Sequence, residues 1–121
     1  MKAARDHARA LLKKAANDLI AAEAILDTVC FHAQQAVEKS LKAILAFHDV
    51  SYPWRHDLGE LVNLVKPLAP QIAPLEDRIL RMTPYAVEAR YDDKFDPLLV
   101  EASQAFATSH EVYALTCKIL E

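Results

Sequence analysis

Residues 30–45 read CFHAQQAVEKSLKAIL, and this stretch decides how the chain folds. Its apolar residues recur at steps of three and four, which is the spacing that places side chains on one face of an α-helix. That face consists of Ala33, Val37, Leu41, Ile44 and Leu45. We therefore predict an amphipathic helix from about residue 30 to residue 48, with this face turned toward a core.

The segment before this stretch carries an apolar seam of its own. From about residue 2 to residue 27 the seam consists of Leu12, Ala15, Leu19, Ala22 and Leu26. Thr28 and Val29 follow, and β-branched residues are weaker helix formers than alanine or leucine. The sequence therefore predicts a break at these two residues, between two helices that pack as a hairpin.

Prolines and capping signals divide the middle of the chain. Residues 49–56 lose the helical spacing, and Pro53 favours an extended loop there. Asp57 with Glu60 three residues later is typical of a capping box at the start of a helix. Pro67, Pro70 and Pro74 then interrupt the chain before a short helix over residues 75–82. Thr83-Pro84 and Asp96-Pro97 both resemble helix starts with proline in the first turn.

The last predicted helix runs from Pro97 to the C-terminus and carries two neighbouring apolar rows. One row consists of Leu98, Ala102, Ala105, Val112 and Ile119. The other consists of Leu99, Phe106, Tyr113 and Leu120. Two rows are wider than a single neighbouring helix covers. Either this helix lies at the centre of the bundle, or its outer row is a subunit interface.

The composition indicates a single all-α domain over residues 1–121. This length supports one core and is too short for a second. Hydrophobic residues make up 53% and charged residues 26%, with one glycine, a balance typical of packed helices. We expect an antiparallel up-and-down bundle of four to five helices.

Charge and cysteine content exclude several classes of protein. The formal charge of −3 gives no overall basic field, so contact with a nucleic-acid backbone would need a local patch. No apolar run is long enough to span a bilayer and no signal peptide is recognisable, so we expect a cytoplasmic protein that does not enter membranes. Cys30 and Cys117 lie far apart, and we expect both to be small buried residues. No two histidines are three or four residues apart, so we expect no metal site and no cofactor.

Three pieces of the sequence together resemble the HEPN domain family of prokaryotes. They are residues 32–42 within the stretch quoted above, then His56-Asp57-Leu58, then Ala89-Arg90-Tyr91, in the family's order. The resemblance covers nearly the whole chain in the order of its elements. It implies a helical bundle that pairs into a homodimer. In many members it also implies a small nucleotidyltransferase partner in a toxin–antitoxin module.

Two polar features interrupt the helix over residues 30–48. At about 100° per residue, a narrow polar stripe is formed by His32, Gln35, Lys39 and Lys42. This stripe is either a solvated face or a surface that binds a nucleotide or a partner. Gln34 and Glu38 instead lie at the margin of the apolar face, where an amide and a carboxylate need hydrogen bonds. A dimer contact or a buried polar pocket would supply those bonds.

Three later residues have both a structural and a functional interpretation. His56 either lines a site or fixes its loop by hydrogen bonding, because Asp57 beside it is accounted for as a helix cap. Arg90, with Tyr91 next to it, either clamps a phosphate or pairs with the nearby acidic residues. His110 on the last helix is expected on a solvated stripe.

The sequence favours a protein that is not an enzyme. Ribonucleases of the wider HEPN group carry an arginine followed after four to six residues by histidine, and no arginine in this chain meets that spacing. We therefore favour a homodimeric subunit that binds a nucleotidyltransferase and helps to hold its nucleotide or substrate. One alternative is a metal-independent ribonuclease toxin that uses Arg90 with His110 or His56 on RNA. The other is a stand-alone nucleotide-binding module that uses Lys39, Lys42 and Arg90.

Overall fold

The protein is an all-α bundle, as predicted. The computed structural model describes residues 2–86, 97 and 99–121, without the side chains of residues 20 and 22–24. The helices are α1 (Lys2–Phe47), α2 (Leu58–Val65), α3 (Glu76–Leu80) and α5 (Leu99–Ile119), with 3-10 turns at Pro70–Leu75 and Thr83–Ala86. No helix in the described part of the chain has an apolar stretch that could cross a membrane.

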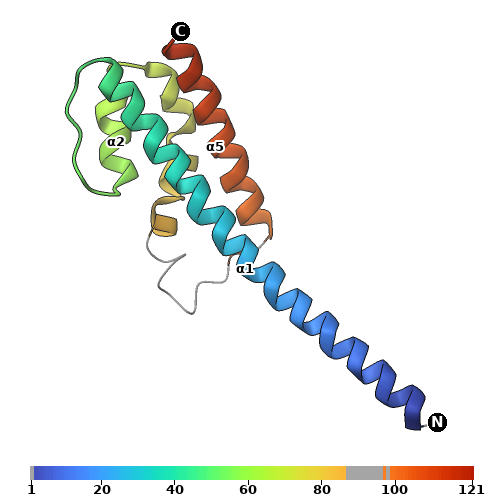
Figure 1. Ribbon diagram of the computed structural model, residues 1–121. Helices are drawn as coiled ribbons and strands as arrows, with labels where there is room; N and C mark the ends of the chain where they lie inside the picture. The colour runs from blue at the N-terminus through green and yellow to red at the C-terminus, as the bar shows by residue number, and fades with distance from the viewer. Residues whose placement is uncertain (1, 87–96, 98) are drawn as a thin grey trace.

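The predicted break at Thr28 and Val29 is wrong, because α1 is one continuous helix of 46 residues. Neither glycine nor proline occurs between residues 2 and 47, and alanine and leucine are frequent. Figure 1 shows the consequence, in which the N-terminal half of α1 leaves the bundle as a single rod. The predicted hairpin of two helices therefore does not form.

α1 ends in a Schellman motif. Asp49 takes a left-handed conformation with φ of 57°. The N–H of Val50 donates to the carbonyl of Leu45 at 2.8 Å, and the N–H of Asp49 donates to that of Ala46 at 3.0 Å. His48 is exposed and places Nδ1 2.9 Å from the carbonyl oxygen of Ile44. The chain then turns back along α1 toward α2.

The α2 helix begins where the sequence predicts. Asp57 is its N-cap, and a carboxylate oxygen accepts the N–H of Glu60 at 3.3 Å. The side chain of Glu60 does not complete the capping box, because it forms an ion pair with Arg55 at 2.8 Å. One half of the predicted motif therefore holds the start of the helix.

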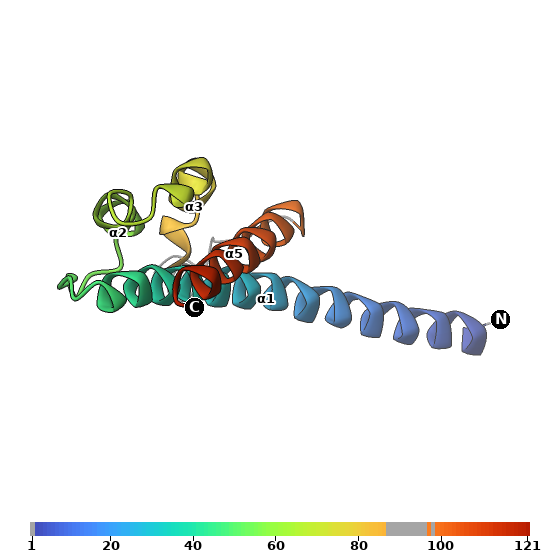
Figure 2. The ribbon, with the colours of Figure 1, turned by 90° about the horizontal axis from the view of Figure 1, so that it is seen from above.

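The helices form two layers around one core. Figure 2 shows α1 and α5 in one layer and α2 and α3 in the other. The predicted face of α1 packs into one core with residues of α2, of α5 and of the chain between them. Core residues that are at most 2% exposed include Val37, Leu41, Ile44, Leu45, Leu58, Leu61, Val62, Val65, Ile72, Ile79, Met82 and Val112. The predicted inner row of α5 is buried at Ala102, Ala105 and Val112, whereas Leu98 lies outside the described residues.

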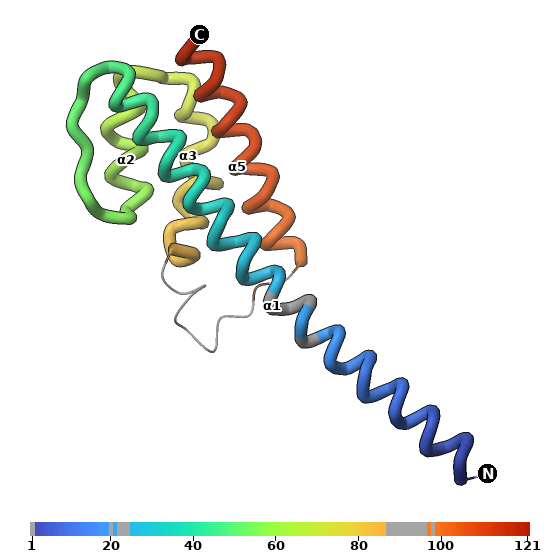
Figure 3. The backbone as a smooth tube through the Cα atoms, in the orientation of Figure 1, coloured from blue at the N-terminus to red at the C-terminus, as the bar shows by residue number. Residues whose placement is uncertain are grey.

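The direction of the helices departs from simple up-and-down alternation. α1 and α5 run side by side in the same direction, because Phe106 lies beside residues 25–36 of α1 and Tyr113 beside residues 36–43. The tube in Figure 3 shows both helices running toward the end where the C-terminus lies. The segment of α3 and Thr83–Ala86 does run antiparallel to α5, since Arg78 meets Thr108 while Tyr85 lines the same pocket as Glu101.

Candidate functional site

A buried carboxylate on α1 organises the first candidate site. Glu38 is only 3% exposed, and its carboxylate accepts from His56 Nδ1 at 2.7 Å. Lys42 Nζ lies 3.8 Å from the same oxygen and 5.3 Å from the centre of the Tyr52 ring. Because Glu38 is an acceptor, Nδ1 carries the proton and Nε2 is the ring nitrogen left for an outside partner. We call Glu38, Lys42, Tyr52 and His56 the Glu38 cluster.

Gln34 lies one helical turn before Glu38 and is fully buried. Its Oε1 accepts from Gln35 Nε2 at 2.8 Å. Its own Nε2 is buried and has no hydrogen-bond partner among the described residues. An unpaired buried amide costs free energy. Packing alone therefore does not explain why a glutamine occupies position 34.

The predicted polar stripe of α1 is divided between two environments. His32 and Lys39 are exposed and line hollows between α1 and α5. Gln35 and Lys42 are half-buried, and Lys42 belongs to the Glu38 cluster. Arg90 and Tyr91, predicted to hold a phosphate, lie outside the described residues. The structure therefore does not gather the predicted nucleotide-binding residues that it describes at one point.

The outer face of α1 and α5 holds two neighbouring hollows. The first, of about 410 Å³, is lined by Ile25, Val29, His32, Ala36 and Phe106 among others. The second, of about 630 Å³, is lined among others by Ala36, Ser40, Ala43, Tyr113, Cys117 and Leu120. Ala36 belongs to both, so the hollows follow one another along a single groove, which we call the α1/α5 groove.

The all-α fold agrees with the result of comparing the chain with known proteins. A family model described as the HEPN domain matches residues 1–120. The chain belongs to the HEPN domain family. Comparison with curated proteins and with solved structures found no match.

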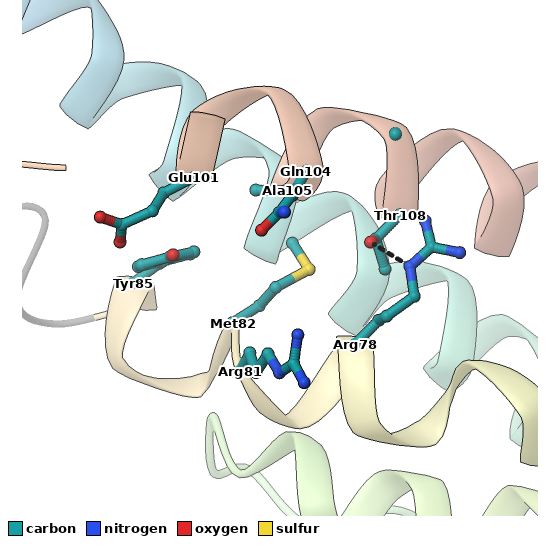
Figure 4. Close-up of a pocket in the computed structure, with 9 residues that line it drawn as sticks. Arg78, Arg81, Met82, Tyr85, Glu101, Gln104, Ala105 and Thr108 are labelled. Carbon is teal, nitrogen blue, oxygen red and sulfur yellow. Dashed lines mark hydrogen bonds between the residues drawn. The ribbon is translucent and has the colours of Figure 1, made fainter. Parts of the chain in front are cut away.

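A pocket between α3 and α5 of this HEPN domain was not predicted from the sequence. Its volume is about 510 Å³, and Figure 4 shows its lining. The floor is apolar, with Met82 and Ala105 almost fully buried. Polar side chains from α3 and its C-terminal end, from the 3-10 turn Thr83–Ala86 and from α5 surround this floor: Arg78, Arg81, Tyr85, Glu101, Gln104 and Thr108.

The two arginines of this pocket differ in their partners. Arg78 Nε donates to Thr108 Oγ1 at 3.2 Å, and its guanidinium also pairs with Glu111. Arg81 is exposed and makes no ion pair with another described residue. Burial raises the pKa of Tyr85, and electrostatic repulsion from the side chains of Cys30 and Glu101 raises it further. A phenol and a guanidinium without an ion pair to any described residue therefore line the same pocket.

Three further residues of this HEPN domain test predictions of exposure or burial made from the sequence. His110 is exposed on α5, as predicted, and its ring centre is 4.5 Å from that of Phe106. Cys30 is buried as predicted, but the prediction for Cys117 is wrong, because that thiol is exposed in the α1/α5 groove. Within the described residues, no three His, Cys, Asp or Glu side chains come together as they would around a metal ion.

Sequence reasoning missed the pocket because its walls are distant in the chain. Arg78 and Arg81 are three residues apart on one helical turn, and this spacing was the available signal. Their opposite wall on α5 begins at least twenty residues later, at Glu101, and no local sequence pattern links the two segments. The Glu38 cluster was better signalled, because Glu38 stands at the margin of an apolar face where a polar residue needs a partner.

Proposed function

We propose that this HEPN domain is a noncatalytic subunit that forms a homodimer and binds a small nucleotidyltransferase, in a module of the toxin–antitoxin type. The observation that carries the proposal is the outer row of α5, which the bundle leaves uncovered. Leu99, Phe106, Tyr113 and Leu120 are 69%, 56%, 60% and 39% exposed. Large apolar side chains grouped in this way on a soluble domain mark an interaction surface.

A second copy of the same chain fits this surface. The exposed row flanks the α1/α5 groove, so ridge and groove lie side by side on one face. A two-fold axis across such a face brings the exposed rows of the two copies into one shared interface, which is how isologous dimers close. Of the two alternatives for α5, the exposed row favours the subunit interface.

The other layer of the bundle stays available for a different protein. The Glu38 cluster lies where α1 meets the loop before α2, and the pocket with Arg81 lies between α3 and α5. Dimerisation through the outer face of α1 and α5 leaves both open. Family membership supports a nucleotidyltransferase as the partner, and the resemblance of residues 32–42 to partnered members supports it further.

Co-purification tests the partner. The HEPN domain, carrying an affinity tag, is expressed with the nucleotidyltransferase encoded by the neighbouring reading frame. We expect a stable complex from size-exclusion chromatography. We also expect His56→Ala to weaken it more than Arg55→Ala, since Arg55 forms a surface ion pair with Glu60 and lies outside the Glu38 cluster. Two proteins that elute separately at micromolar concentration would contradict the proposed partnership.

The ribonuclease alternative draws support from one observation, the pairing of His56 with a buried carboxylate. Such a pair can hold an imidazole for general base chemistry. The sequence lacks the arginine–histidine spacing of ribonuclease members, so we expect purified protein to leave RNA intact. RNA cleavage that His56→Ala or Arg90→Ala abolishes, with circular dichroism unchanged, would replace our proposal with this alternative.

The pocket between α3 and α5 supports the nucleotide part of the proposal. Its volume of about 510 Å³ is in the range of small-molecule sites, and Arg81 provides a cation at its edge. We expect calorimetry on the complex with its partner to show nucleoside triphosphate binding that Arg81→Gln weakens about tenfold, the effect of one charged hydrogen bond. Arg55→Gln is the control, and equal affinities for the two variants would exclude this pocket.

A further inference from the structure

The first half of α1 is exposed at residues 2–19 and 21 and packs against no other described part of the chain. Residues 2–24, which we call the arm, leave the bundle as a helix about 35 Å long at 1.5 Å per residue. Its leucines lie on one broad side of the helix and face solvent, with Leu11, Leu12 and Leu19 at 54%, 71% and 67% exposed. An exposed leucine face on a projecting helix requires a partner surface in the assembled protein.

The arm also differs in charge from the rest of the chain. It carries five basic residues before residue 19, namely Lys2, Arg5, Arg9, Lys13 and Lys14, against Asp6 and Asp18. With Glu23 counted, the formal charge of the arm is +2, and since the whole chain carries −3, the residues outside the arm carry −5. None of these five cations makes an ion pair with another described residue. The body of a second copy therefore attracts the arm.

The α1/α5 groove has the shape that such an arm needs. Its floor is formed by small side chains, including Ala36, Ser40 and Ala43 on α1 and Thr116 on α5. Small residues let a second helix approach closely and leave room for leucine side chains. The groove begins beside Ile25, where the arm ends, and follows α1 from there toward its C-terminal end.

We propose that the two copies of the dimer exchange arms, each arm lying in the α1/α5 groove of the other copy. This inference rests on the proposed homodimer and adds to it the element that fills the groove. The arm covers residues 2–24 and the rest of α1 covers residues 25–47, so the two halves of the helix have equal length. A two-fold axis near the middle of α1 lays each arm along the other copy's half-helix.

The symmetry fixes which side chains meet. With the axis at the middle of α1, a residue at a given distance from the N-terminal end of one copy lies beside the residue at the same distance from the C-terminal end of the other. Leu19 therefore falls at the level of Cys30 of the second copy. Leu11 and Leu12 fall at the level of Val37 and Glu38. The first level lies within the hollow of about 410 Å³ and the second within that of about 630 Å³. Each hollow therefore receives leucine from the arm.

A cysteine already present in the groove allows a direct test. Cys117 lines the larger hollow and is exposed, whereas Cys30 is fully buried and does not compete. The full-length Leu12→Cys variant is treated with a short bismaleimide and analysed on a denaturing gel. We expect a covalent dimer that Leu12→Cys/Cys117→Ser does not form. Asn17→Cys is the matched control, since Asn17 points to the opposite side of the helix, and it should give at least tenfold less covalent dimer.

Sedimentation of the untreated protein separates failure of this inference from failure of the homodimer. A protein that sediments as a dimer but gives no dependence on Cys117, or that cross-links equally at position 17, overturns the exchange of arms and leaves the dimer standing. A monomer overturns both. If the arm binds nucleic acid instead, the cross-link is absent and Arg5→Gln/Arg9→Gln/Lys13→Gln loses binding to single-stranded RNA, which also overturns the proposal.

Discussion

The carboxylate of Glu38 is buried, while the imidazole that it accepts from is 59% exposed. When the carboxylate is removed, His56 and Lys42 can still be hydrated. The loss in the free energy of unfolding is therefore smaller than for a fully buried ion pair. We predict that Glu38→Ala lowers the free energy of unfolding by about 2 kcal/mol in urea titrations, from the lost hydrogen bond and the lost packing. Glu60→Ala, which removes a surface ion pair with Arg55, should cost about 0.5 kcal/mol or less. Equal costs for the two variants would contradict the geometry.

Cys30 gives the fold a dependence on alkaline pH. Burial raises the pKa of its thiol from 9.0 to about 11, with Glu101 and Asp27 adding to the shift. In the unfolded chain the thiol ionises near pH 9, whereas in the folded chain it stays neutral, so this residue favours unfolding as the pH rises from 9 toward 11. We predict that the loss of stability over that range is smaller in Cys30→Ala, as measured by urea titration at each pH. A parallel decline in both proteins would show that another group is responsible.

At the scale of single residues, angular position on a helix predicted more than identity did. Gln34 and Glu38 were singled out because they stand at the edge of an apolar face, and both are buried. The sequence did not identify the hydrogen-bond partner of Glu38. His56 comes from a loop eighteen residues later, and the sequence left two interpretations for this histidine. For Cys117, residue type gave a wrong prediction. Cysteine is usually buried, but this position on α5 faces the groove and the thiol is exposed.

The helix α1 is continuous, whereas the sequence predicted a break in it at Thr28 and Val29. Thr28 and Val29 each cost only a few tenths of a kcal/mol relative to good helix formers. The apolar spacing continues across them, with Leu26 and Val29 packed against the core. Weak local preference is therefore outweighed by tertiary packing, and the two seams belong to one helix.

A proline at this point separates local preference from packing. We predict that Thr28→Pro lowers the free energy of unfolding by about 3 kcal/mol, because proline removes a helix hydrogen bond and clashes with the preceding turn. Circular dichroism and urea titration measure this change, and Thr28→Ala is the matched control, expected within about 0.5 kcal/mol of wild type. If Thr28→Pro were as stable as Thr28→Ala, α1 would not be continuous there.

The cap of α2 was predicted from two residues, and one of them performs the role. Asp57 accepts the N–H of Glu60, while the carboxylate of Glu60 turns to Arg55. We predict that Asp57→Ala costs about 1 kcal/mol in thermal or urea unfolding, and that Asp57→Asn costs a few tenths. A loss in Asp57→Asn as large as in Asp57→Ala would show that charge, and not capping, stabilises this end.

For the whole molecule, the sequence predicted the class of fold and the existence of an uncovered face. The two apolar rows of α5 led to two alternatives, and the exposure of the outer row favours an interface. The shared direction of α1 and α5 was not predictable, because it depends on how the chain crosses the bundle between residues 47 and 99. The same holds for the pocket with Arg81, whose walls only this crossing brings together.

Sedimentation equilibrium on wild type and one double variant tests the central claim most directly. We predict a mass of about 27 kDa for wild type, twice the 13.5 kDa of the chain, and 13.5 kDa for Phe106→Glu/Tyr113→Glu. Lys118→Glu makes the same change in net charge on another side of α5, and it should remain a dimer. A wild type of 13.5 kDa, or a double variant that stays at about 27 kDa, would contradict assembly through the face of α1 and α5.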